Sequence, residues 1–306
     1  MAVATLKHFI HHESAGGIVL FVTAVLAMIV ANSGWSGAYY DFMHVPVAVQ
    51  LGNFAIDKPL LLWVNDGLMA IFFFLIGLEV KREVLQGELA DPSQIVFPAF
   101  AALGGMVVPV GVYLLVTGGD PAAFAGWAVP AATDIAFALG ILSLLGNRVP
   151  LSLKMFLLAL AIFDDIGAIL IIALFFGGDL SVYSLIWAGG GMALLVLFNV
   201  LGVRRASLFV LVGVFVWASV LKSGIHATLA GALIAMVIPL KTKGAHGEPL
   251  LTHMEHALHP WVAFFILPLF AFMNAGVPLA QMTPSMLLDP IPLGIALGLL
   301  VGKAVG

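Results

Sequence analysis

Long apolar stretches follow one another along this chain of 306 residues, and they constrain its fold more than any other feature. Hydrophobic residues make up 62% of the chain and charged residues only 9%, whereas a soluble domain carries about a quarter charged residues. The lengths of the stretches suit a hydrocarbon core of about 30 Å, so we expect an all-α polytopic membrane protein. The stretches lie near residues 14–32, 59–80, 95–117, 121–145, 150–176, 181–201, 206–221, 224–240, 258–276 and 291–306.

The segments between the stretches are short, so we expect a single transmembrane domain over residues 1–306. Between the first two stretches, VPVAVQLGNFAID alternates apolar and polar residues around Gly52 and Asn53, which predicts a small extramembrane hairpin near residues 45–58. The chain has no cysteine, which excludes disulfides and thiolate metal sites. We find no nucleic-acid-binding segment and expect no cofactor.

The basic residues between the stretches predict the orientation of the chain. They gather at the N-terminus and in every second loop, whereas the opposite loops hold only Lys58 and Lys222. Because loops rich in lysine and arginine stay in the cytoplasm, we expect a cytoplasmic N-terminus. The residues of the rich set are Lys7, Lys81, Arg82, Arg148, Lys154, Arg204, Arg205, Lys241 and Lys243.

The tenth stretch, IPLGIALGLLVGKAVG, reaches Gly306 without a polar flank. A helix that starts at Ile291 rises only about 23 Å by that point, at 1.5 Å per residue. That rise is shorter than the hydrocarbon core, so we expect the C-terminal part of a longer membrane protein to be missing.

Ionisable residues lie inside several stretches. Asp134, Asp164 and Lys303 fall near the middle of three different spans, and Asp66 lies about a third of the way into the second. A charge at the bilayer centre costs about 2.5–3.5 kcal/mol on insertion scales, so such residues are expected to serve a function. The alternative is that they form pairs that only hold helices together.

The doubled acid in ALAIFDDIGAILII argues against a purely structural pair. Neighbouring residues on a helix point about 100° apart, so one lysine cannot neutralise both Asp164 and Asp165. The face of Asp164 also carries Gly167 and other small residues, which allow another helix to approach closely. Carboxyl groups in such surroundings can hold either a proton or a metal ion near neutral pH. This is the chemistry of a proton-coupled cation carrier.

The preceding stretch, AGWAVPAATDIAFALG, places Pro130 in mid-span. Proline removes a helical hydrogen bond, and broken backbone at membrane depth is tolerated where it lines a cavity or is buried in protein. A proline kink alone is common, but here Thr133 and Asp134 follow within one turn. Their oxygens and the freed carbonyls are hard ligands that suit sodium or lithium.

A second group of polar residues lies at the expected cytoplasmic ends of the spans. GLEVKREVLQGE ends the second span, and HMEHALHP opens the ninth with three histidines at intervals of three residues. Histidine titrates near pH 6.5, so the group could sense cytoplasmic pH. It could also be a plain interfacial collar, or His253, His256 and His259 could bind a metal such as zinc.

Five motifs, in order along the chain, resemble the NhaA-type sodium/proton antiporters. The resemblance implies a secondary transporter with inverted repeats and a broken fourth helix, a fold of which NhaA itself is a known example. Members of that family have twelve spans, so about ten would be present here. The motifs are NDGLMAIFFFLIGLEVKRE, VPAATDIAFALG, LALAIFDDIGAILIIALFF, SGIHATLAG and MEHALHPWVAFFILPLFAFMNAGV.

The resemblance also implies residue roles. Asp164 and Asp165 match the paired aspartates that bind the sodium or lithium ion and the protons. Thr133 and Asp134 match the extended segment of the broken helix, and Lys303 matches a lysine that partners one of the acids. The hairpin matches the dimer contact of the family. Six positions match residues linked to pH regulation: Glu79, Lys81, Glu83, His226, Glu255 and His256.

The function that the resemblance implies is export of sodium or lithium ions from a bacterial cell across the inner membrane. A larger number of protons enters, so the exchange is electrogenic. The residues alone also allow a proton- or sodium-coupled symporter. An intramembrane aspartyl protease would need facing acids that share a proton and typically a Gly-x-Gly-Asp motif, which is not found inside the spans. We therefore expect a transporter and no enzyme.

Overall fold

The computed structural model describes residues 13–52, 54–87, 92–121, 123–131, 148–175, 180–242, 244 and 247–306. Helices dominate this part of the chain, as the composition predicts, and the described strands form a single hairpin. The chain divides into two compact units. One unit comprises Met1–Arg82 and Phe175–Pro278, and the other comprises Glu83–Leu174 and Leu279–Gly306.

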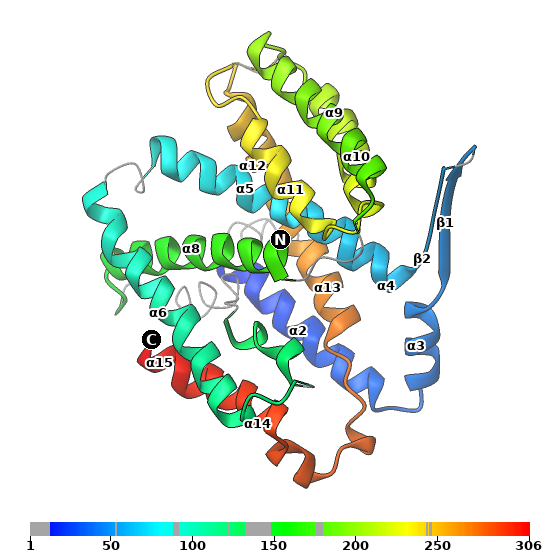
Figure 1. Ribbon diagram of the computed structural model, residues 1–306, viewed down its shortest axis with the longest axis vertical. Helices are drawn as coiled ribbons and strands as arrows, with labels where there is room; N and C mark the ends of the chain where they lie inside the picture. The colour runs from blue at the N-terminus through cyan, green and yellow to red at the C-terminus, as the bar shows by residue number, and fades with distance from the viewer. Residues whose placement is uncertain are drawn as a thin grey trace, which may run out of the picture. The chain divides into compact units, whose positions relative to one another are not determined.

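The first unit has its core where α5, α9, α10, α11 and α12 meet. Leu78, Leu195 and Phe209 are almost completely buried there, each on a different helix. Figure 1 shows α9 and α10 side by side. The helical segments of this unit are α2 (Glu13–Ala31), α3 (Ser36–Met43), α4 (Leu60–Leu62), η1 (Trp63–Leu68), α5 (Met69–Gln86), α9 (Val182–Val200), α10 (Ala206–Leu221), α11 (Thr228–Val237), α12 (Leu250–Trp261), η6 (Val262–Ile266) and α13 (Leu267–Asn274).

Glycine allows α5 and α11 to pack backbone against backbone. A Cβ at Gly77 would lie 2.6 Å from Ala235 Cβ, and one at Gly231 would overlap the carbonyl oxygen of Ala70. Small residues at such crossings let membrane helices gain van der Waals contact at short range. The two helices therefore depend on glycine at these positions.

The predicted hairpin is confirmed. Strand β1 (Pro46–Leu51) pairs antiparallel with β2 (Phe54–Pro59), in register from Pro46 opposite Pro59 to Leu51 opposite Phe54. Gly52 has φ of 60°, a conformation that glycine adopts without steric cost in tight hairpin turns. Figure 1 shows the hairpin extending from α3 and α4 as a two-stranded arm.

The second unit contains α6 and the last helical run of the chain, which pack along each other (Figure 1). The last run carries glycine at every fourth position, and these glycines lie against α6. The helical segments of this unit are α6 (Pro92–Thr117), η3 (Phe124–Gly126), η4 (Val129–Ala131), α8 (Leu151–Phe175), η7 (Leu279–Gln281), η8 (Pro284–Leu288), α14 (Pro290–Leu297), η9 (Gly298–Gly302) and α15 (Lys303–Val305).

Helices occupy the apolar stretches that the sequence predicts, apart from 121–145, most of which lies outside the described residues. In the described part of the chain, four helical runs are long and apolar enough to cross a bilayer. The helices α2 and α3 meet at a bend of 116° and make a fifth candidate if they count as one span. The prediction of ten spans and of an inverted repeat stays a prediction. The four helical runs that are long and apolar enough to cross a bilayer are Leu60–Gln86, Val96–Thr117, Val182–Val200 and Leu250–Asn274.

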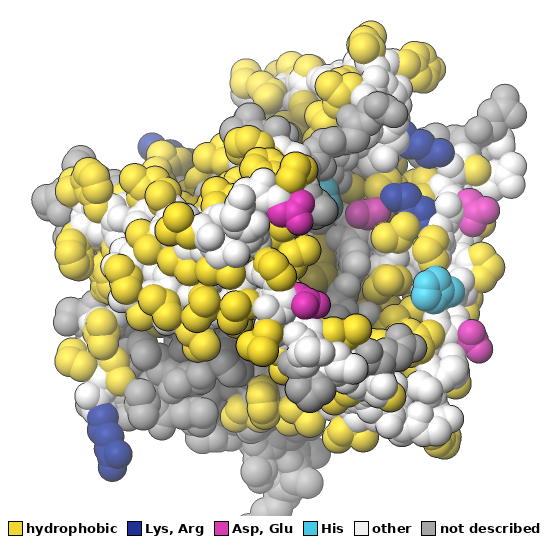
Figure 2. All heavy atoms as spheres, turned by 60° about the horizontal axis from the view of Figure 1, so that its bottom comes forward, with side chains coloured by type: hydrophobic (Ala, Val, Ile, Leu, Met, Phe, Trp, Pro, Cys, Tyr) yellow, Lys and Arg dark blue, Asp and Glu magenta, His cyan; other side chains and the backbone are white. Residues whose placement is uncertain are grey.

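Large hydrophobic side chains cover much of the surface. Phe97 is 70% exposed and Leu115 is 83% exposed, and Figure 2 shows many hydrophobic side chains on one face, with few charged ones among them. Soluble monomers rarely expose apolar patches of this extent. The surface is therefore suited to contact with lipid.

Candidate ion-binding site

The doubled acid lies within α8, a helix of 25 residues. Asp164 is 3% exposed and Asp165 is 9% exposed, and each has one carboxylate oxygen with almost no contact with solvent. Gly167, one turn after Asp164, is covered by the side chain of Met106 from α6. The small residues on this face therefore admit a neighbouring helix, as the sequence predicts.

Lys303 meets one of the two acids. Its ammonium Nζ lies 3.2 Å from Asp164 Oδ2, and it also donates a hydrogen bond of 2.9 Å to the carbonyl oxygen of Ala131. The sequence left open which aspartate pairs with this lysine, and the structure assigns Asp164.

The glycines of the last helical run bring Lys303 to this place. A Cβ at Gly302 would lie 2.5 Å from Pro109 Cα, and one at Gly298 would lie 2.8 Å from Pro130 Cβ and 3.0 Å from the carbonyl oxygen of Pro109. Sequence reasoning missed this contact. The signal that could have found it is the repeated small-xxx-small spacing of Gly294, Gly298, Gly302 and Gly306.

The backbone is irregular on both sides of the Lys303 ammonium. Pro130 is buried within the short 3₁₀ segment η4, and the carbonyl of the next residue, Ala131, accepts the hydrogen bond from Lys303. On the other side, η9 has π-helical hydrogen bonding and ends at Gly302, directly before the lysine. Single π turns inside helices are frequent at functional sites. Thr133 and Asp134, which the sequence places at the same site, lie outside the described residues.

The comparisons with known proteins agree on one family. The family described as Na+/H+ antiporter 1 matches residues 7–306. The chain belongs to this family.

Curated relatives cover almost the whole chain. The Na(+)/H(+) antiporter NhaA of Pseudomonas putida strain GB-1 is 58% identical over 298 residues, which make up 97% of this chain and 76% of that protein. The Na(+)/H(+) antiporter NhaA of Escherichia coli O1:K1 is 57% identical over 98% of this chain and 77% of its own length. Membership of this family makes the chain a multi-pass membrane transporter and not an enzyme, so the aspartyl protease alternative has no support.

Two basic residues of the expected cytoplasmic group make specific contacts in the first unit. Lys81 Nζ donates hydrogen bonds of 2.7 Å and 2.6 Å to the carbonyl oxygens of Met236 and Ile238, at the C-terminal end of α11. A lysine here satisfies terminal carbonyls and complements the helix dipole. Arg82 Nε lies 2.9 Å from Oε2 of the buried Glu255, on α12. These contacts connect α5 to α11 and α12.

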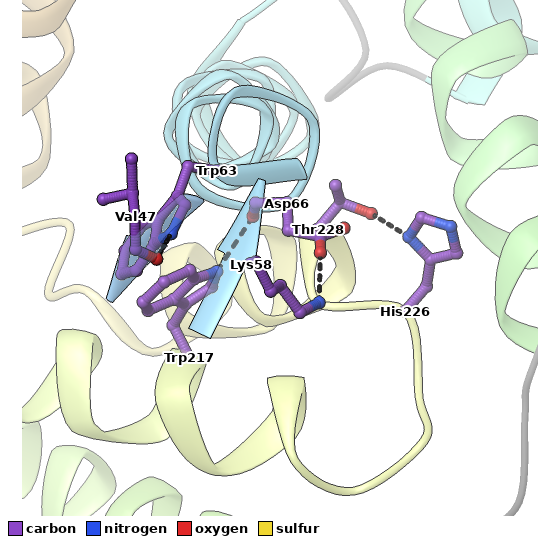
Figure 3. Close-up of polar contacts among 7 residues, drawn as sticks. All are labelled: Val47, Lys58, Trp63, Asp66, Trp217, His226 and Thr228. Carbon is purple, nitrogen blue, oxygen red and sulfur yellow. Dashed lines mark hydrogen bonds and ion pairs between the residues drawn. The ribbon is translucent and has the colours of Figure 1, made fainter. Parts of the chain in front are cut away.

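The other residues of that group are more dispersed. Glu79 is half-buried on α5, His256 is exposed on α12, and Glu83 follows Arg82 at the start of the second unit. His226 shares a hydrogen bond of 3.2 Å with Thr228 at the start of α11 (Figure 3). Within the described residues, no three histidine or acidic side chains converge as metal ligands. The zinc alternative for the histidines of α12 therefore finds no support.

Asp66 lies in the π-helical segment η1 of the first unit, far along the sequence from the two aspartates of α8. Its Oδ2 lies 2.7 Å from Lys58 Nζ, and its carbonyl oxygen accepts a hydrogen bond of 2.9 Å from Trp217 Nε1. Trp63 Nε1 donates to the carbonyl oxygen of Val47 in β1 (Figure 3). These contacts hold the hairpin against η1, and η1 against α10. Sequence reasoning singled out Asp66 but missed its partners.

Proposed function

We propose that this chain exchanges sodium ions for protons across the bacterial inner membrane as a secondary active antiporter. The single observation that carries the proposal is the pair of adjacent buried carboxylates, Asp164 and Asp165, with the Lys303 ammonium 3.2 Å from Asp164. Family membership supports the same exchange, since relatives that cover nearly the whole chain carry the name Na(+)/H(+) antiporter.

The carboxylates act by holding either protons or one cation. A dehydrated sodium ion requires ionised oxygen ligands, and a protonated carboxyl loses most of its attraction for the ion, so the two occupancies exclude each other. If the site changes its exposure from one side of the membrane to the other only when it is occupied, the sodium and proton gradients become coupled. The Lys303 ammonium lowers the free-energy cost of burying the Asp164 carboxylate. When Asp164 takes up a proton, this ion pair is lost.

The cation is held by oxygen atoms alone. Asp164 and Asp165 supply carboxylate ligands, and Thr133 and Asp134 supply further oxygens from the broken helix. Hard oxygen ligands of this kind suit lithium as well as sodium, so we propose that both ions are carried. More than one proton enters for each cation, which makes the exchange electrogenic.

Regulation by pH is assigned to the group that lies near the ends of α5, α11 and α12. Glu79, Lys81, Glu83, His226, Glu255 and His256 are its members. The ion pair between Arg82 and Glu255 supports this role, because protonation of Glu255 would weaken the contact between α5 and α12. The hydrogen bonds from Lys81 join α5 to α11 in the same region.

The remaining parts of the proposal concern the whole protein. We place the N-terminus in the cytoplasm, treat residues 1–306 as one transmembrane domain, and assign the fold to the inverted-repeat transporters with about ten of twelve spans present. The hairpin at residues 45–58 would hold two copies together as a homodimer, since strand edges present unpaired backbone groups.

Replacement of Asp165 by Asn tests the proposed function. In everted membrane vesicles with an imposed pH gradient, sodium addition should dissipate the gradient in the parent chain and fail to do so in the D165N variant. An amide cannot exchange a proton for a cation in this pH range. Asp289→Asn, at an exposed position outside the site, should retain exchange.

Two results would contradict the proposal. One is unchanged sodium-dependent dissipation in D165N at the same protein level in the membrane. The other is a sodium-dependent pH change of the opposite sign, which would indicate sodium–proton symport. Lithium in place of sodium measures the cation preference in the same vesicles.

A further inference from the structure

The first unit contains an apolar cavity of about 560 Å³ that the ion site does not use. Its walls come from η1 and α5 on one side and from α10 and α11 on the other, with Val47 of the hairpin at one end. Among the lining residues are Trp63, Phe74, Phe209 and Trp217. The volume falls within the usual range of small-molecule sites, about 300–1,000 Å³.

The wall of this cavity is apolar throughout. Its two indole rings, Trp63 and Trp217, each have their N–H group engaged by a carbonyl oxygen, that of Val47 and that of Asp66 respectively (Figure 3). The rings therefore offer only carbon to an occupant. A cavity lined in this way does not retain water, and an empty one forfeits van der Waals contacts. Its occupant is expected to be a hydrocarbon.

The mouth of the cavity is formed by exposed hydrophobic side chains. Ile71 is 37% exposed, Val210 is 50% exposed and Val214 is 56% exposed, and all three line the cavity. In a membrane transporter such residues face lipid, because apolar surface of this kind avoids water. A hydrocarbon chain can therefore enter from the bilayer.

Opposite charges lie next to residues that line the cavity, and neither charged side chain is itself part of the lining: Lys58 pairs with Val47 across the hairpin, and Asp66 precedes Gly67. Lys58 and Asp66 form an ion pair at 2.7 Å with side chains 29% and 16% exposed, and Gly67, next to Asp66, lines the cavity. An ammonium has three donors, and the bond to Asp66 uses one of those on Lys58. A phosphate can accept from the others, while an ammonium on the ligand can donate to Asp66. The pair is thus complementary to a zwitterionic head group.

From these observations we propose that the cavity binds one acyl chain of a zwitterionic phospholipid whose head group carries a primary ammonium. Its phosphate lies at Lys58 and its ammonium lies at Asp66. A lipid tail already surrounded by hydrocarbon gains no hydrophobic free energy on entering. Selectivity therefore comes from packing in the cavity and from the head group.

The test uses the whole chain in lipid nanodiscs with a phosphatidylethanolamine that carries a photoreactive group on one acyl chain. After irradiation, mass spectrometry should locate the label in Trp63–Phe74 and Val210–Trp217. Val210→Trp, which closes the mouth, and Gly213→Leu, which fills the cavity, should each lose this label. Leu211→Trp is the matched control, because Leu211 is 66% exposed on the same helix and does not line the cavity.

The head group is tested with probes that share the acyl chain but carry phosphatidylethanolamine, phosphatidylcholine or phosphatidylglycerol heads. Phosphatidylethanolamine should label the cavity most strongly, and Lys58→Gln should remove that preference. Equal labelling by all three heads overturns the head-group assignment. Labelling that persists in Val210→Trp and Gly213→Leu, or that is absent from the parent chain, overturns the acyl-chain site. Both readouts measure binding, so a loss of transport in the Asp165 variant has no bearing on them.

Discussion

At the level of single residues, the organisation of the ion site follows from adjacent acids on a helix. Because Asp164 and Asp165 point about 100° apart, one lysine on a neighbouring helix can reach one of them at hydrogen-bond distance but not both. In the structure, Lys303 Nζ lies 3.2 Å from Asp164 Oδ2. The division of roles that we propose for the two acids follows from this helical geometry.

Removal of the lysine should destabilise the protein through Asp164. Lys303→Met takes the ammonium away from a carboxylate that is 3% exposed, and loss of one partner of a buried pair costs about 3–5 kcal/mol. The apparent melting temperature in detergent should fall clearly. The second substitution Asp164→Asn in the same chain should restore part of it, because the buried charge is then absent. Lys241→Met, at an exposed position, is the control and should have little effect.

Sequence reasoning could place these charges but could not choose the partner. The apolar surroundings of Asp164, Asp165 and Lys303 predict burial, and a count of residues along each span predicts a common depth. The pairing joins residues 139 positions apart, and it depends on the direction in which each side chain leaves its helix. That direction is set by tertiary packing, which one sequence does not reveal.

At the level of elements, glycine spacing decides how closely the last helical run approaches α6. Gly298 and Gly302 lie against Pro109 with no room for a side chain. They are the first and last residues of the π-helical segment η9, and Lys303 follows directly. The hydrophobic stretches were predictable, because their length and composition are local properties. The contact between these two elements was less evident, because a glycine in a membrane helix can face either a partner or lipid.

Alanine substitution separates these two kinds of glycine. At Gly302 the added Cβ meets the Pro109 backbone, so the helix has to shift, at a cost of about 1–3 kcal/mol for overpacking. At Gly111 of α6 nothing lies within 4 Å of the added Cβ, and alanine favours a helix over glycine by about 0.8–1.0 kcal/mol. Gly302→Ala should therefore lower the apparent melting temperature and weaken exchange, whereas Gly111→Ala should leave both unchanged or raise stability. Equal effects at both sites would contradict the close approach.

At the level of the whole molecule, the charges in the loops between the helices predict how the chain is oriented in the membrane. Lys58 and Asp57 belong to the hairpin, which the proposed orientation places on the side that most basic residues avoid, and the same orientation places the loops with Arg204, Arg205 and Lys241 on the other side. The sequence predicts this alternation without any knowledge of packing, because insertion responds to local loop charge. Loop charge does not predict how the helices pack within each unit.

Single cysteines provide the test of orientation, because the chain contains no cysteine of its own. Asp57→Cys in the hairpin and Lys241→Cys between α11 and α12 both lie at exposed positions. In intact spheroplasts, a membrane-impermeant maleimide should label Asp57→Cys and leave Lys241→Cys unmodified. In inverted vesicles the pattern should reverse, and in detergent both should react. Labelling of Lys241→Cys from outside, with Asp57→Cys protected, would place the N-terminus outside the cytoplasm and would refute the proposed orientation.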